Sequence, residues 1–126
     1  MALDKKLESP DMKYLLEPRG VAVFGASSKP GKFGYMILEH MVESGYDKSK
    51  IYPINLKGGN AFGIDFYTSL DEVKGKPVDN AYILVPAKYV FDSVKSCKEN
   101  GVNFVQILSS GFSEAWNEKG EKEIVD

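Results

Sequence analysis

The sequence is short of several residue types, and each shortage excludes a class of protein. A single cysteine, Cys97, cannot form an internal disulfide and fits a reducing, cytoplasmic setting. No apolar run approaches the roughly 20 residues of a membrane-spanning helix, and the polar start of the chain predicts no signal peptide. The net charge is only -2, which disfavours a nucleic-acid partner. With one histidine, His40, the sequence has no cluster of metal ligands.

What remains is typical of one globular domain with a parallel sheet. Of the 126 residues, 43% are hydrophobic, which suffices for a single core. Short apolar runs alternate with amphipathic stretches, and this alternation predicts a three-layer α/β fold with helices on both faces. We expect a Rossmann-like, doubly wound sheet of strand order 3-2-1-4-5, with ligands at the carboxyl ends of the strands. The predicted strands are residues 21–24, 51–55, 63–67, 80–85 and 103–108.

Helix signals lie between these strands. Apolar residues recur every four positions from Phe33, and Gly45 marks the end of that helix. Ser69 and Glu72 have the spacing of a capping box and predict a short helix. A further helix is expected over residues 89–99, with Cys97 on its apolar face.

The two ends of the chain differ from its middle. Residues 1–18 are polar and predict a lead-in with one short helix, ahead of a domain over residues 19–126. Helix-forming residues continue to Asp126 with no strand after them. Because a crossover helix in this fold leads into another strand, we expect the chain to be a fragment of a longer protein.

The stretch "VAVFGASSKPGKFG" joins the first predicted strand to the first long helix. It lacks the Gly-Lys-Ser/Thr of a Walker A loop, and Ser27 stands where a dinucleotide fingerprint has its second glycine. Gly25 permits the turn, Ser27, Ser28 and backbone N–H groups suit an anion at a helix N-terminus, and Lys29 and Lys32 add positive charge. We therefore predict a phosphate-bearing ligand; the alternative is a tight turn without a ligand.

The second strand limits the choice of ligand. Dinucleotide sites for NAD carry an acidic residue near the end of this strand, but "IYPINLKGGN" has none. Asn55 is polar and Lys57 is cationic, a pattern that favours a phosphorylated ribose. NADP and coenzyme A both carry one, so both remain open on these residues, as does a solvated turn lysine with no ligand.

Four blocks together resemble a known family. They are "VAVFGASSKPGKFG", "IYPINLKGG", "ILVPAKYV" and "ILSSGFSE", and with their spacing they cover nearly the whole chain. In this order they resemble the coenzyme A-binding domain of NDP-forming acyl-CoA synthetases, especially the ADP-forming acetate–CoA ligases. The resemblance to the α subunit of succinyl-CoA synthetase is more distant.

The resemblance implies a Rossmann-like sheet that binds the nucleotide end of coenzyme A at its carboxyl edge. It assigns ligand contacts to the ends of four strands, with the pantetheine arm nearest the last. These positions are Gly25, Ala26, Ser27, Ser28 and Lys32 in the first loop, Pro53, Asn55 and Lys57 in the second, Val85 and Pro86 in the third, and Ser109, Ser110 and Gly111 in the fourth.

The resemblance also implies which parts a complete synthetase needs besides this chain. Those enzymes use an ATP-grasp module and a phosphorylated histidine in a following domain, and His40, in the first helix, is not that residue. The chain alone is expected to bind and not to catalyse. Two alternatives remain: an NAD(P)-binding regulatory or sensor domain, which the missing strand-2 acid disfavours for NAD, and the coenzyme A-binding domain of a protein acetyltransferase.

Overall fold

The computed structural model describes residues 12–108, in which strands and helices alternate as expected. The helices are α2 (Lys13–Leu16), α3 (Phe33–Glu43) and α4 (Ala87–Glu99), with short 3-10 turns η1 (Lys48–Lys50) and η2 (Leu70–Val73). The strands are β1 (Val21–Phe24), β2 (Ile51–Ile54), β3 (Asn60–Ala61), β4 (Ile64–Asp65), β5 (Asn80–Ile83) and β6 (Phe104–Ile107).

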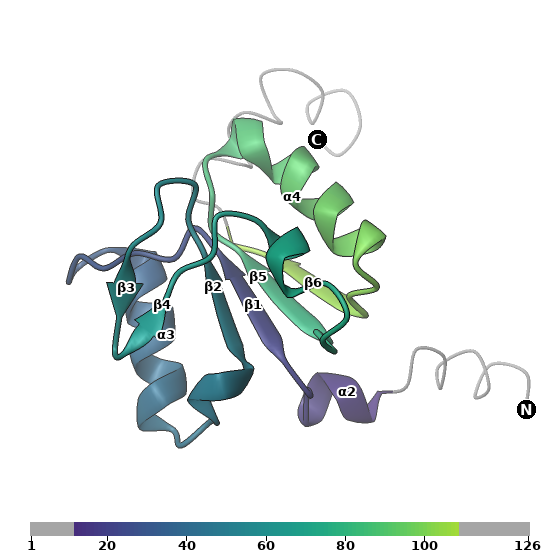
Figure 1. The fold of residues 1–126 in the computed structure, drawn as a ribbon, viewed down its shortest axis with the longest axis horizontal. Coiled ribbons are helices and arrows are strands. Elements are labelled where there is room, and N and C mark those ends of the chain that lie inside the picture. The colour runs from purple at the N-terminus through teal and green to yellow at the C-terminus, as the bar shows by residue number, and fades with distance from the viewer. Residues whose placement is uncertain (1–11, 109–126) are drawn as a thin grey trace, which may run out of the picture.

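The main sheet has four parallel strands in the order β2-β1-β5-β6. Alternate residues of β1 belong to different core clusters: Val21 and Val23 pack with Leu38 of α3, whereas Ala22 and Phe24 pack with Val90 of α4. The two long helices therefore cover opposite faces of the sheet (Figure 1). This arrangement confirms the Rossmann-like α/β class and the relative order of four of the five expected strands.

The expected strand over residues 63–67 is wrong in its extent. The two residues of β4 pair antiparallel with β3 in a separate small sheet, and only Tyr67 bridges Ile54 at the edge of β2. The reason is the turn at Phe62 and Gly63, whose φ values of 56° and 78° reverse the chain into a hairpin before a longer strand forms. This hairpin lies beside α3 and β2 in Figure 1.

The contact of Tyr67 with the edge of β2 also explains why a proline is tolerated within that strand. The N–H of Tyr67 donates to the carbonyl oxygen of Pro53 at 2.8 Å, on the side of β2 that faces away from β1. The N–H and C=O of one strand residue point to the same side, so the missing N–H of Pro53 also belongs to this outer side. A proline is tolerated there because no ladder bond with β1 is lost.

The helix ends follow the sequence signals with one change. Gly45, after the end of α3, has a left-handed φ of 90°, as predicted. Ser69 caps η2, but its Oγ accepts from the N–H of Asp71, and the carboxylate of Glu72 accepts from the N–H and hydroxyl of Thr68. The predicted cap is present, and Glu72 turns back toward the start of η2 as in a capping box; the hydrogen bonds from Thr68 lower the pKa of its carboxyl most, and the N–H of Ser69 has a smaller effect.

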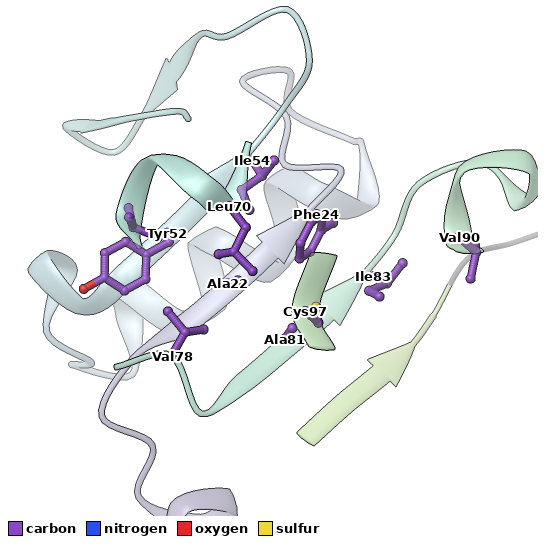
Figure 2. Packing of buried hydrophobic residues seen from close by; sticks show 11 residues of the cluster. Ala22, Phe24, Tyr52, Ile54, Leu70, Val78, Ala81, Ile83, Val90 and Cys97 are labelled. Atoms are coloured by element: carbon purple, nitrogen blue, oxygen red, sulfur yellow. The ribbon is translucent and has the colours of Figure 1, made fainter. Parts of the chain in front are cut away.

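The face of the sheet under α4 carries the larger core cluster (Figure 2). Phe24, Ile83 and Leu70 are buried there, and Cys97 is fully buried. Burial raises the pKa of the Cys97 thiol to about 12, so the thiol is protonated and enclosed. This confirms Cys97 as a core residue rather than a nucleophile.

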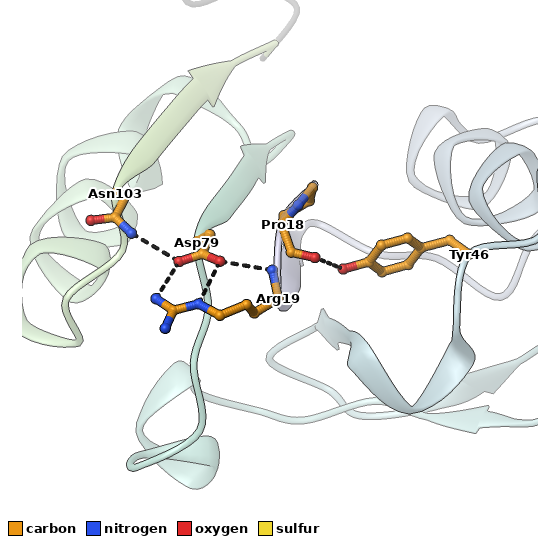
Figure 3. A network of polar contacts seen from close by, with 5 residues as sticks. All are labelled: Pro18, Arg19, Tyr46, Asp79 and Asn103. Atoms are coloured by element: carbon orange, nitrogen blue, oxygen red, sulfur yellow. Dashed lines mark hydrogen bonds and ion pairs between the residues drawn. The ribbon is translucent and has the colours of Figure 1, made fainter. Parts of the chain in front are cut away.

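A buried carboxylate ties three strands together at the opposite, amino edge of the sheet (Figure 3). Asp79, 0% exposed, precedes β5 and accepts from the backbone N–H, Nε and Nη2 of Arg19 at 2.7, 2.9 and 2.8 Å. It also accepts from Nδ2 of Asn103 at 2.8 Å. Arg19 precedes β1 and Asn103 precedes β6, so this single side chain aligns the starts of their strands.

Candidate functional site at the carboxyl edge

Three loops leave the sheet side by side at its carboxyl edge. In the register of the sheet, Phe24 lies between Ile54 and Ile83, so each loop begins at the same level. The N–H groups of Gly25 and Ala26 both donate to the carbonyl of Ile54, at 2.9 and 3.2 Å. The structure thus brings together the first three predicted loops. Ser109, Ser110 and Gly111, the predicted fourth, lie outside the described residues.

Two glycines make the first loop possible. Gly25 has φ of 91°, and a Cβ there would lie 2.8 Å from the backbone of Leu84. A Cβ on Gly34, in the first turn of α3, would lie 2.1 Å from the carbonyl oxygen of Gly25. Glycine at both positions therefore lets α3 begin directly against the loop, which points its N-terminus at the carboxyl edge.

The first loop presents donors that have no protein partner among the residues that the structure describes. No side chain caps the N-terminus of α3, where Lys32 is the N-cap residue. Lys29 and Lys32 are exposed, and neither pairs with an acidic side chain among residues 12–108. Ser28 is exposed, while Ser27 is half-buried and its Oγ accepts from the N–H of Lys29 at 3.0 Å. Free N–H groups at a helix N-terminus together with unpaired lysines suit an anion.

The third loop adds a second helix N-terminus, which the sequence analysis did not single out. Pro86 is the exposed N-cap residue of α4 and makes no side-chain cap, and Val85 before it is half-buried. Lys88 lies in the first turn, with Nζ 5.1 Å from the ring centroid of Tyr89. A proline directly after a buried apolar run is the signal that predicts this feature.

The second loop is built around Asn55. Its Nδ2 donates to the carbonyl of Ala26 in the first loop at 2.8 Å, and its Oδ1 accepts from the N–H of Lys57 at 2.8 Å. Lys57 is exposed and pairs with no acidic side chain in the described part of the chain. Ala26 is 1% exposed and Pro53 is fully buried. Both side chains support the loops from within, and the ligand contacts predicted for these two residues stay predictions.

Other features of the described residues do not form a competing catalytic centre. His40 is exposed on α3, toward the amino edge, where it lines an open cavity of about 600 Å³ with Tyr46 and Asn80. That cavity is on the wrong edge for the predicted ligand. No group of three or more His, Cys, Asp or Glu side chains within residues 12–108 is placed to hold a metal ion. None of the helices in this range is both long and apolar enough to cross a membrane.

The fold and this edge define a nucleotide-binding domain of the Rossmann type. A match to the CoA binding domain family covers residues 19–125, and the chain belongs to that family. It is 44% identical over 121 residues to the α subunit of ADP-forming acetate–CoA ligase I from Pyrococcus furiosus, covering 91% of this chain and 26% of that subunit.

Two further comparisons agree with the family. The ADP-forming acetate–CoA ligase of Methanocaldococcus jannaschii is 38% identical over 90% of this chain, which covers 16% of that enzyme. The solved structure of acetyl-coenzyme A synthetase 1 from Candidatus Korarchaeum cryptofilum superposes with a TM-score of 0.76 at 37% identity, over 91% of this chain and 25% of that one. The chain thus spans about a quarter or less of the length of these relatives.

Proposed function

We propose that this chain binds coenzyme A at the carboxyl edge of its sheet and serves as the coenzyme A-binding part of an ADP-forming acyl-CoA synthetase in the cytoplasm. The parent reaction would convert acyl-CoA, ADP and phosphate into the free acid, coenzyme A and ATP, in either direction. The ATP-grasp and phosphohistidine modules that such an enzyme needs would be supplied by other domains or subunits, so this chain binds without catalysing.

The observation that carries the proposal is the combination of charge and free donors at one edge. The N-termini of α3 and α4, which no side chain caps, belong to loops of this edge. So do Lys29, Lys32 and Lys57, none of which pairs with an acidic side chain within residues 12–108. Coenzyme A carries a pyrophosphate and a separate 3′-phosphate, so its nucleotide end needs more than one anion-binding point. In this proposal the first loop and α3 hold the pyrophosphate, and Lys57 reads the 3′-phosphate.

Thermal melts with coenzyme A, NAD and NADP test the choice of ligand. A ligand that binds only the folded state stabilises it by about 2.7 kcal/mol at a hundredfold excess over its dissociation constant. We expect coenzyme A to raise the melting temperature and NAD to leave it unchanged, because β2 is not followed by an acid that would bind a free ribose hydroxyl. A shift with either dinucleotide and none with coenzyme A would refute the proposal.

Replacing Lys57 tests which phosphate it reads. Lys57→Ala should weaken coenzyme A more than dephospho-coenzyme A, which lacks the 3′-phosphate, because a charge-assisted contact is lost only with the former. The expected difference is roughly tenfold in dissociation constant, corresponding to about 1.4 kcal/mol. Lys95→Ala, an exposed lysine on α4, is the matched control. Equal losses for both ligands would place Lys57 away from that phosphate.

A further inference from the structure

One side-chain amide connects the two loops to which the proposal assigns the pyrophosphate and the ribose phosphate. Nδ2 of Asn55 donates to Ala26 of the first loop, and Oδ1 of Asn55 accepts from the N–H of Lys57, both at 2.8 Å. A carbonyl can only accept and an N–H can only donate, so this orientation of the amide is the one that satisfies both partners. Each end of the amide therefore makes one hydrogen bond to a different loop of the protein.

The backbone N–H and C=O groups of Asn55 also form hydrogen bonds within the protein. The N–H of Asn55 donates to the carbonyl of Tyr67, and its carbonyl accepts from the N–H of Gly58, both at 2.8 Å. The second bond closes a turn over residues 55–58, with Lys57 inside it. Asn55 is thus anchored to the edge of the sheet while its amide sets both the turn that carries Lys57 and the distance of this turn from the first loop.

We infer that Asn55 is a positioning residue that couples the two loops, a role beyond the ligand contact that the family resemblance implies. This inference rests on the proposed function. The amide of Asn55 holds Lys57 at a fixed separation from the first loop, so that one ligand with two phosphate groups engages both loops at once. Without the amide each loop still has its own donors. The affinity for the ligand is then lower, because binding must also order the second loop before the donors of both loops can act together.

The two side-chain hydrogen bonds of Asn55 form a brace between the loops, and two substitutions separate their effects. Asn55→Ala removes both hydrogen bonds. Asn55→Ser retains a hydroxyl that can accept from the N–H of Lys57, as serine does in turns, but is too short to reach Ala26. Asn60→Ser changes an exposed asparagine of β3 in the same loop region and is the matched control. All variants are made in the whole chain, and melting temperatures show that each is folded.

The decisive readout is the ratio of dissociation constants for dephospho-coenzyme A and coenzyme A, measured by calorimetry at fixed ionic strength. We expect Asn55→Ala to weaken coenzyme A roughly tenfold and to reduce this ratio to that of Lys57→Ala. Asn55→Ala combined with Lys57→Ala should have the same ratio as Lys57→Ala alone, because the two residues act as one unit. Asn55→Ser should retain part of the ratio. A merely structural role would weaken both ligands equally and leave the ratio unchanged, which would overturn the inference.

A ligand-free measurement keeps this inference separate from the proposed function. Hydrogen exchange at the Lys57 amide should be slow in the unmodified chain and at least tenfold faster in Asn55→Ala, but close to normal in Asn55→Ser and Asn60→Ser. Unchanged exchange in Asn55→Ala would refute the brace. If this protection is found but the unmodified chain does not bind coenzyme A, the proposed function alone is overturned.

Discussion

Asp79 shows how much a single residue can contribute to the order of the sheet. Burial acts to raise the pKa of its carboxyl, but the hydrogen bonds and charge of Arg19, with a smaller effect of Asn103, outweigh burial and lower the pKa. Asp79→Asn should reduce the free energy of unfolding by roughly 1–3 kcal/mol near neutral pH, because one amide cannot satisfy all the donors that the carboxylate accepts from. Chemical denaturation of the two proteins measures this difference.

The pH dependence of this contribution has a definite sign. A carboxyl whose folded-state pKa is lowered stabilises the fold above its unfolded value, near 3.8, and the contribution is lost as the pH falls through the lower, folded-state pKa. The stability difference between the wild type and Asp79→Asn should therefore be largest above about pH 5 and shrink in acid. Asp65→Asn, at an exposed position, is the control. A difference that stays constant down to pH 2 would contradict the role of the ionised carboxylate.

At the scale of single residues, the sequence predicted only some of the side chains that shape the carboxyl edge and the sheet. The glycines, serines and lysines of the carboxyl edge could be predicted, because each is adjacent in sequence to a recognisable strand end. The Arg19–Asp79 pair could not, since its members are 60 positions apart and neither belongs to a motif. Asn55 lies at the carboxyl edge, as predicted from its place at a strand end, but a polar residue there does not reveal whether it binds a ligand or another loop.

At the scale of the elements, α3 depends on its close approach to the first loop. On helix propensity alone, Gly34→Ala should stabilise α3 by up to about 1 kcal/mol. The new Cβ would instead lie 2.1 Å from the carbonyl oxygen of Gly25. Because that atom belongs to the backbone, we expect a net loss of roughly 1–3 kcal/mol and weaker coenzyme A binding. Glu43→Ala, at an exposed position of the same helix, should be nearly neutral. A stabilised Gly34→Ala protein would show that α3 can move away from the loop without penalty.

The elements that were predicted correctly share one property. β1, β2 and β5 are short apolar runs whose residues are mostly buried, so local sequence and tertiary packing agree in these strands. The segment 58–67 differs because its conformation is set by left-handed residues. Gly58, Gly59 and Gly63 are suited to that backbone, but Phe62 is not and is held by its ring, 4.8 Å from that of Tyr35. A contact between α3 and the hairpin thus overrides the local preference, which no short sequence window contains.

At the scale of the whole molecule, the sheet has one edge that the described residues leave open. Phe104 and Leu108 donate their N–H groups to the carbonyls of Asp79 and Ile83, on the β5 side. Successive residues of a strand alternate in direction, so the N–H of Ile107 points away from β5. No strand among residues 12–108 pairs with this side of β6. Such an edge offers backbone donors and acceptors to any strand that approaches it.

We therefore expect this chain, studied alone, to self-associate through β6 as its concentration rises. Ile107→Pro should reduce the association, because it removes an outward N–H without removing a ladder bond to β5. Gln106→Pro, whose N–H faces β5, should instead lower the melting temperature, which separates a blocked edge from a damaged sheet. Sedimentation velocity over a wide concentration range measures the association. A chain that remains monomeric throughout would mean that this edge is covered, and an Ile107→Pro protein that associates like the wild type would place the contact elsewhere.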